Sequence, residues 1–151
     1  MTRGPFYNHF SSKEELMADS IKHGLRKTLQ HLGASDSSPE GKANYIDSYL
    51  STAHRDAPGR GCLMAAPGSE IRQTPQVRAA FATQLKAIIE KLAPHFPWGS
   101  KRSAGGDSIR ALSSMVGGLI LARAVDDEAF STEILSGWWY WFCRANGRSK
   151  V

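Results

Sequence analysis

Residues 12–33 read SKEELMADSIKHGLRKTLQHLG, and this stretch decides the fold class. Its apolar residues recur every three or four positions, which is the period of an amphipathic α-helix. The members of this apolar stripe are Leu16, Met17, Ile21, Leu25, Leu29 and Leu32. Ser12 and Glu15 have the spacing of a capping box, and Gly33 is typical of a residue just past a helix end. The stretch therefore predicts a helix over 12–32.

The rest of the chain repeats this period, and no segment alternates polar and apolar residues for long enough to predict a strand. Ser38, with Pro39 after it, predicts a second helix that continues until Pro58 and Gly59. Further helices are predicted at 75–92, 107–125 and 128–144, with a short helical piece around 61–72 and a surface loop between 94 and 107. The predicted fold class is all-α.

Composition limits the function classes. The 151 residues suit one domain with its own core, and a formal net charge of +5 favours phosphate-bearing partners without deciding for them. Cys62 and Cys143 are too far apart in sequence to suggest a zinc site or a disulfide framework, so we expect a reducing cytoplasm. The longest apolar run, at 115–125, is much shorter than the roughly 20 residues that span a bilayer, so no membrane partner is expected.

The opening stretch, TRGPFYNHFSSKEEL at 2–16, packs aromatic and basic residues tightly together. It resembles the second half of the helix-turn-helix in TetR-family transcriptional regulators. The matching residues are Thr2, Arg3, Gly4, Phe6, Tyr7, His9, Phe10, Ser12, Lys13, Glu14 and Leu16. The resemblance implies an all-α regulator that binds DNA through this segment.

Physical chemistry supports that role for individual residues. Arg3 can pair bidentately with guanine and Thr2 can contact a base edge, while Tyr7, His9 and Lys13 can contact phosphate oxygens. Gly4 belongs to the same expected DNA-binding set through the matched motif. Taken singly, the tyrosine, the histidine or the lysine could instead cap, pack or simply be solvated. In this order, we interpret them as a surface that reads double-stranded operator DNA.

The resemblance also implies a domain division. In the TetR family two helices and a turn precede this motif, so we expect residues 1–32 to be the remnant of a helix-turn-helix domain with its connecting helix. We expect 33–151 to be the effector-binding and dimerisation domain. Without the preceding helices, DNA binding by this chain is expected to be weak and without sequence preference.

Two further sites are predicted in the second domain. Aromatic and flexible apolar residues suited to a small-molecule pocket between helices are Tyr45, Tyr49, Met64, Phe81 and Met115, although plain core packing is the alternative for each. The last two long helices carry more apolar surface than one chain can cover, which predicts a homodimer. The expected interface residues are Leu112, Val116, Leu119, Ile120, Ile134, Trp138 and Phe142.

The predicted function is a ligand-responsive, DNA-binding transcriptional regulator, a repressor by type, with an effector that the sequence does not identify. The alternative is a helical small-molecule-binding and dimerisation module without DNA binding. We expect no enzyme activity, because Cys62 and His54 have no third partner in the sequence pattern, and we expect no cofactor or metal. Cys62 remains a minority candidate for a redox sensor, because Arg60 lies just before it.

Overall fold

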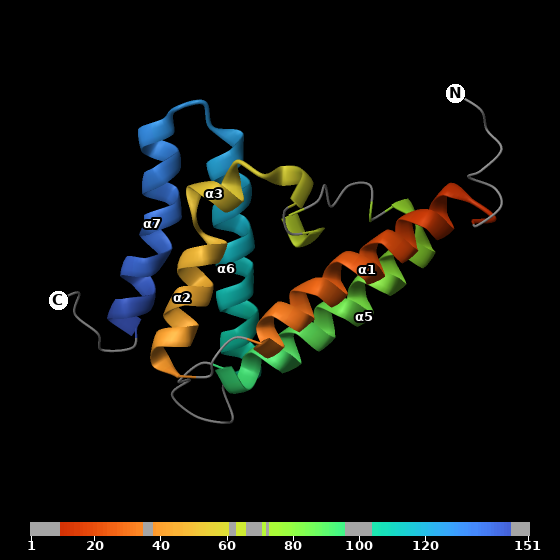
Figure 1. Cartoon of the computed structure of the whole chain (residues 1–151), viewed down its shortest axis with the longest axis horizontal. Helices are drawn as coiled ribbons and strands as arrows, with labels where there is room; N and C mark the ends of the chain where they lie inside the picture. Colours follow the sequence, from red (N-terminus) through yellow and green to blue (C-terminus); the bar gives the residue numbers. More distant parts are fainter. Residues whose placement is uncertain are drawn as a thin grey trace.

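The computed structural model describes residues 10–34, 38–60, 63–65, 71, 73–95 and 104–145. Within these ranges each regular element is a helix, which confirms the all-α fold class (Figure 1). The elements are α1 (Lys13–Ala34), α2 (Pro39–Tyr49), α3 (Thr52–Arg55), η1 (Pro58–Arg60), η2 (Leu63–Ala65), α5 (Pro75–Leu92), η3 (Ala93–His95), α6 (Ala104–Ala124) and α7 (Glu128–Ala145).

Helices α1 and α5 lie side by side and run in the same direction, forming an arm that extends away from the other helices (Figure 1). Their parallel direction follows from two contacts. Glu15 near the start of α1 shares a groove with Gln76 at the start of α5, and Gly33 at the end of α1 lies against the side chain of Lys91. Both helices therefore begin at the outer end of the arm and end beside α6.

The other long helices form the body of the molecule. Helices α6 and α7 are an antiparallel hairpin joined by residues 125–127, and α2 stands beside them (Figure 1). Asp127 begins α7 by accepting a 3.0 Å hydrogen bond from the Phe130 amide. The short turn between the two helices is thus fixed by a side-chain cap.

One hydrophobic core joins the arm to the body. Leu25 and Leu32 of α1, Ile88 of α5 and Leu119 of α6 are each at most 1% exposed. Burying a side chain of this size stabilises the fold by about 1.5–3 kcal/mol relative to leaving it in water. Five of the six residues in the apolar stripe predicted for 12–32 lie in this core or pack against it: Met17, Ile21, Leu25, Leu29 and Leu32.

Segment η2 lies between the arm and the body, in contact with α1 and α6. A Cβ atom added to Gly24 of α1 would lie 2.0 Å from Cδ1 of Leu63, so the glycine allows this side chain to pack directly against the α1 backbone. The next residue, Met64, is buried in the core. Gly24 therefore has a packing role here.

The caps largely confirm the predicted helix starts. The Glu15 amide donates to Ser12 Oγ at 3.1 Å, and the Gly41 amide donates to Ser38 Oγ at 3.1 Å. The Glu15 carboxylate accepts from the backbone and hydroxyl of Ser11, one residue earlier than a capping box with Ser12 requires. These bonds from Ser11 hold the pKa of the Glu15 carboxyl below its ordinary value.

Two predicted boundaries are wrong. The second predicted helix is interrupted at Leu50, because Ser51 adopts an extended backbone and caps a new short helix through a 3.1 Å bond from the His54 amide. Helix α6 begins at Ala104, three residues before the predicted start. Asp107 lies in its first turn and pairs with Arg110, so it is not the cap.

Candidate functional site

The predicted DNA-binding segment enters the described structure at its last residues. Lys13 is exposed at the first position of α1, directly after the caps made by Ser11 and Ser12. The other predicted DNA-binding residues lie outside the described residues: Thr2, Arg3, Gly4, Tyr7 and His9. Lys13 is thus placed at the outer end of the arm, and the last matched residues of the motif, Lys13, Glu14 and Leu16, lie in the first turn of α1.

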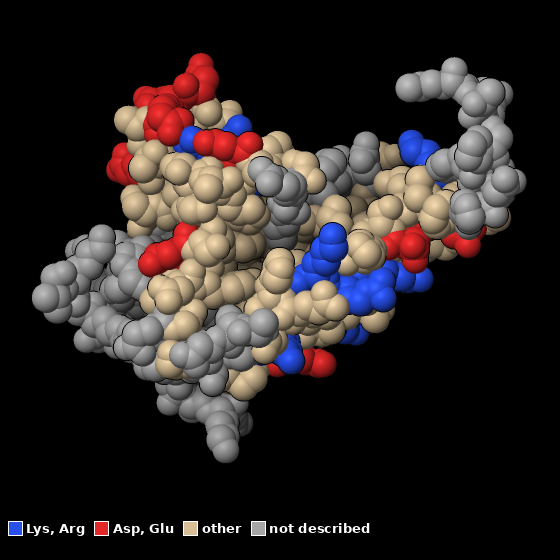
Figure 2. Space-filling model, in the orientation of Figure 1, with Lys and Arg blue, Asp and Glu red and all other residues tan. Residues whose placement is uncertain are grey.

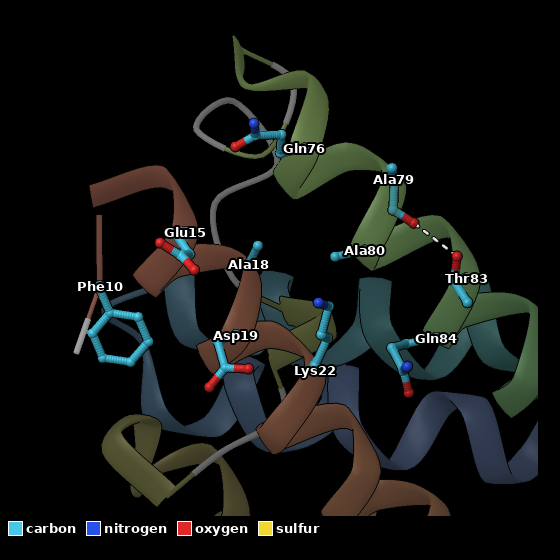
Figure 3. A pocket seen from close by; sticks show the side chains of 10 residues that line it. All are labelled: Phe10, Glu15, Ala18, Asp19, Lys22, Gln76, Ala79, Ala80, Thr83 and Gln84. Carbon is cyan, nitrogen blue, oxygen red and sulfur yellow. Dashed lines mark hydrogen bonds between the residues drawn. The ribbon is translucent and has the colours of Figure 1, made fainter. Parts of the chain in front are cut away.

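An open groove of about 840 Å³ lies between α1 and α5 at this outer end (Figure 3). Its lining residues are Phe10, Glu15, Ala18, Asp19, Lys22, Gln76, Ala79, Ala80, Thr83 and Gln84. The lining combines apolar groups, from Phe10 and three alanines, with carboxylate, ammonium and amide groups. The Thr83 hydroxyl is already engaged, because it donates to the Ala79 carbonyl at 3.0 Å. Sequence periodicity did not predict this groove, because it depends on how two helices distant in sequence align.

The five residues predicted to line a ligand pocket do meet in the fold, but they meet as part of the hydrophobic core. Tyr49, Met64 and Met115 are buried, and Tyr45 and Phe81 pack partly buried against the same cluster. They come from α2, η2, α5 and α6, so four elements meet around them. The rings of Tyr45 and Tyr49 are 6.5 Å apart, and His54 meets Tyr49 edge-on at 4.9 Å. None of the five lines the groove between α1 and α5. A ligand pocket among these five residues therefore stays a prediction.

The residues predicted for a dimer interface divide into three groups. Leu112 and Leu119 are buried inside the chain, so their side chains have no surface to offer a partner, which corrects their assignment. The reason is that this face of α6 packs into the shared core. Ile120 is 43% exposed, and Val116 and Ile134 are half-buried. The side chains of Trp138 and Phe142 lie outside the described residues.

Other apolar side chains are exposed on the same two helices. Ile109 and Leu121 of α6 are 51% and 57% exposed, and Phe130 of α7 is 49% exposed. With Ile120 they make up the large exposed hydrophobic residues of the described chain. Of these four, the sequence pattern predicted only Ile120 as an interface residue, because helical periodicity identifies apolar faces without telling which face the chain itself covers.

A polar cluster that the sequence did not predict ties α3 to α6 and α7. Arg55, only 8% exposed, donates to the carboxylates of Asp56 and Glu128 and, at 2.8 Å, to Ser131 Oγ. Ser131 in turn donates to the Ala122 carbonyl at 2.7 Å. A buried guanidinium requires such partners, because an unpaired buried charge is costly.

Arg123 completes this cluster from α6. Its side chain donates to the carbonyls of Arg55 and His54, at 3.0 and 2.8 Å, and so caps the last turn of α3. The adjacent carboxylates raise the pKa of Arg55, and the hydrogen bonds from Arg55 lower the pKa of Asp56. The cluster fixes α3 in place and leaves no free nucleophile or base at its centre.

Other chemistry receives little support from the described residues. They contain no group of three or more His, Cys, Asp or Glu side chains arranged to hold a metal ion. His54 is engaged through Nδ1, 2.6 Å from the Tyr49 carbonyl, and Cys62 lies outside the described ranges. No helix in the described part of the chain has the length and apolar character that crossing a membrane requires.

Comparison with protein-family models gave no match, and comparison with curated proteins gave none either. The resemblance to TetR regulators stays a prediction from the sequence.

Proposed function

We propose that this protein is a ligand-responsive, DNA-binding transcriptional regulator of the TetR type that works as a homodimer. The observation that carries the proposal is the continuity between the opening motif and the arm. Lys13 belongs to the motif and is also the first residue of α1, a single 22-residue helix. At about 1.5 Å per residue, α1 is a rod of roughly 33 Å that would carry a DNA-reading segment at one end.

The inner end of this rod reaches the core where an effector would act. Leu32 is buried in the same cluster as Tyr49, Met64 and Met115, and Leu63 packs into the gap that Gly24 leaves in α1. A ligand that enters among these residues would change their packing and, with it, the position of α1. Such a ligand regulates DNA binding if its affinity differs between the two positions of the arm.

Dimerisation is supported by the exposed apolar residues of α6 and α7. Ile109, Ile120, Leu121 and Phe130 offer apolar surface on two adjacent long helices. Two such helix pairs could associate as a four-helix bundle, with a self-complementary interface. This feature does not depend on the opening motif, so it also supports the second candidate function, a ligand-binding and dimerisation module without DNA binding.

Selection of duplexes from a random pool tests the proposal against this second candidate. The selection uses the chain as printed and a version extended by the two helices that precede the motif in TetR regulators. We expect the extended version to enrich a near-palindromic sequence and to lose that preference on Arg3→Ala or Lys13→Ala. Arg110→Ala, which removes an exposed arginine of α6, is the control and should leave the preference intact. Failure to enrich any sequence, by a folded dimer, would leave the module as the better description.

A further inference from the structure

Charge is divided unevenly along α1. Its first turns hold Glu14, Glu15 and Asp19, whereas residues 20–34 hold three cationic side chains and no carboxylate. These cations are Lys22, Arg26 and Lys27, and all three are exposed. Lys22 and Arg26 are one helical turn apart, so they lie on the same face of α1. This half of α1 therefore carries a row of positive charge without a carboxylate of its own, although its first member, Lys22, shares a groove with Glu15 and Asp19 and helps to lower the pKa of Glu15.

Helix α5 extends the row. Lys91 is exposed, and its Cε and Nζ lie 3.3 Å from the point that a Cβ of Gly33 would occupy, so it reaches across to the end of α1. Gly33 follows Arg26 by seven residues, and hence lies on the same face of α1 as Lys22 and Arg26. We call Lys22, Arg26, Lys27 and Lys91 the basic stripe. Along the axis of α1 it covers about 16 Å, from the rise of 1.5 Å per residue.

The cations of the stripe differ from the arginines of the body. Arg55 and Arg110 pair with carboxylates, and Arg123 donates to backbone carbonyls. Among the described residues, the basic stripe forms no ion pair. Figure 2 shows blue side chains over the arm with red ones beside them, and a mainly red group at the end of the body where α6 meets α7.

From this arrangement we infer that the basic stripe is a binding surface for the phosphate backbone of nucleic acid, without sequence preference. A row of solvated cations matches a row of phosphates, and binding releases the counterions of the nucleic acid. Gln84, which faces the same groove as Lys22, adds a neutral hydrogen-bonding group beside the row.

The stripe is a separate site from the opening motif. Lys22 lies nine residues after Lys13, about 13 Å along α1, and the carboxylates of Glu14, Glu15 and Asp19 are exposed between them. Negative charge there repels phosphate, so one continuous contact from Lys13 to Arg26 is disfavoured. The inference thus does not require sequence-specific DNA reading.

The stripe fits nucleic acid better than a membrane surface. A helix that binds at a membrane surface combines cations with large apolar residues that enter the lipid. Here the residues beside the cations are polar, such as His23, Thr28 and Gln30. The large exposed hydrophobic residues of the described chain are all on α6 and α7.

The test compares two double variants that remove the same charge. Lys22→Gln/Arg26→Gln changes the stripe, and Arg78→Gln/Lys86→Gln removes two exposed cations of α5 outside it. Fluorescence anisotropy with a 24-base-pair duplex of arbitrary sequence gives the binding constant at several KCl concentrations. Each phosphate contact contributes about −0.9 to the slope of log K against log salt. The slope for the stripe variant, which lacks two contacts, should therefore be shallower than that of the unmodified chain by about 1.8. The control should lose less than half of that.

Equal losses in the two variants would overturn the inference, because only overall charge would then matter. Binding to phosphatidylserine vesicles that depends on the stripe, with duplex binding unchanged, would overturn it in favour of a membrane. Salt-sensitive self-association that depends on the stripe, with duplex binding unchanged, would also overturn the inference. The partner of the stripe would then be the acidic end of a second copy of the chain. Circular dichroism confirms that each variant is folded.

Failure of this inference is distinguishable from failure of the proposed function. Lys22→Gln/Arg26→Gln should weaken selected and scrambled duplexes by the same factor. Arg3→Ala should weaken the selected duplex alone.

Discussion

Arg55 and Ser131 are the residues whose chemistry most constrains the body of the molecule. Ser131 is 2% exposed and holds two elements at once, since it accepts from Arg55 of α3 and donates to the Ala122 carbonyl of α6. Local sequence patterns did not reveal this, because the partners are 76 and 9 positions away. A serine in an apolar helix such as α7 otherwise gives no signal of its own.

Ser131→Ala should lower the free energy of unfolding by about 1–3 kcal/mol, because it leaves the Ala122 carbonyl and one Arg55 N–H without this partner. Urea denaturation measures the loss. Ser136→Ala is the matched control, since Ser136 is exposed on the same helix and bonds only within it, to the Glu133 carbonyl. Its effect should stay within about 0.5 kcal/mol. Equal effects of the two substitutions would mean that the buried bonds contribute nothing.

At the scale of elements, the docking of α3 depends on ionised carboxylates. Hydrogen bonds from Arg55, with a smaller contribution from the charge of Arg123, hold the pKa of Asp56 below its ordinary value of 3.8. A carboxyl whose pKa is lower in the folded state contributes stability above the pKa of the unfolded state. It loses that contribution as the pH falls through the folded value.

The free energy of unfolding of the unmodified chain should therefore exceed that of Asp56→Asn at pH 6, and the difference should shrink as the pH falls below about 4. Urea midpoints at pH 6, 4 and 3 measure the difference. Asp47→Asn, a change on α2 away from Arg55, should show no comparable narrowing. A difference between the chain and Asp56→Asn that is the same at pH 6 and pH 3 would contradict the assigned role of this pair.

Most elements were predictable from local signals, and the exceptions have physical causes. Ser12, Ser38 and Pro75 marked helix starts correctly, because capping and proline geometry depend on neighbouring residues only. The interruption at Ser51 was missed because the apolar stripe continues across it, from Tyr49 and Leu50 to Ala53. Polar capping by one serine was enough to divide the helix there.

The candidate sites were less predictable than the elements. Tyr45 and Tyr49 do meet Met64 and Met115, as the sequence suggested, but in the core. The groove beside Phe10 and the basic stripe both depend on the parallel pairing of α1 with α5. That pairing joins segments about sixty residues apart, which helical periodicity does not relate.

At the scale of the whole molecule, the exposed apolar residues of α6 and α7 predict association. Ile120→Glu should convert a dimer to a monomer, because it would bury a charge at the interface. Sedimentation equilibrium at micromolar concentration measures the mass. Lys86→Glu, at an exposed position on α5, is the control and should leave the dimer intact. If the unmodified chain has the mass of one copy at every concentration, the dimer is excluded.

Leu119→Glu could not replace Ile120→Glu in the test of the dimer, although both residues lie on α6. Leu119 is fully buried in the chain's own core, so a charge there should unfold the protein. Ile120, one position on, is the residue whose substitution separates association from folding.

Hydroxyl-radical footprinting of a selected duplex tests the central claim most directly. If two copies present their opening segments together, the N-terminally extended dimer should protect two half-sites about 34–36 Å apart, one helical turn of DNA. Ile120→Glu should abolish the paired protection while the protein stays folded. Uniform protection of any sequence, or a single protected half-site that Ile120→Glu does not change, would contradict the account of a dimeric DNA-reading regulator.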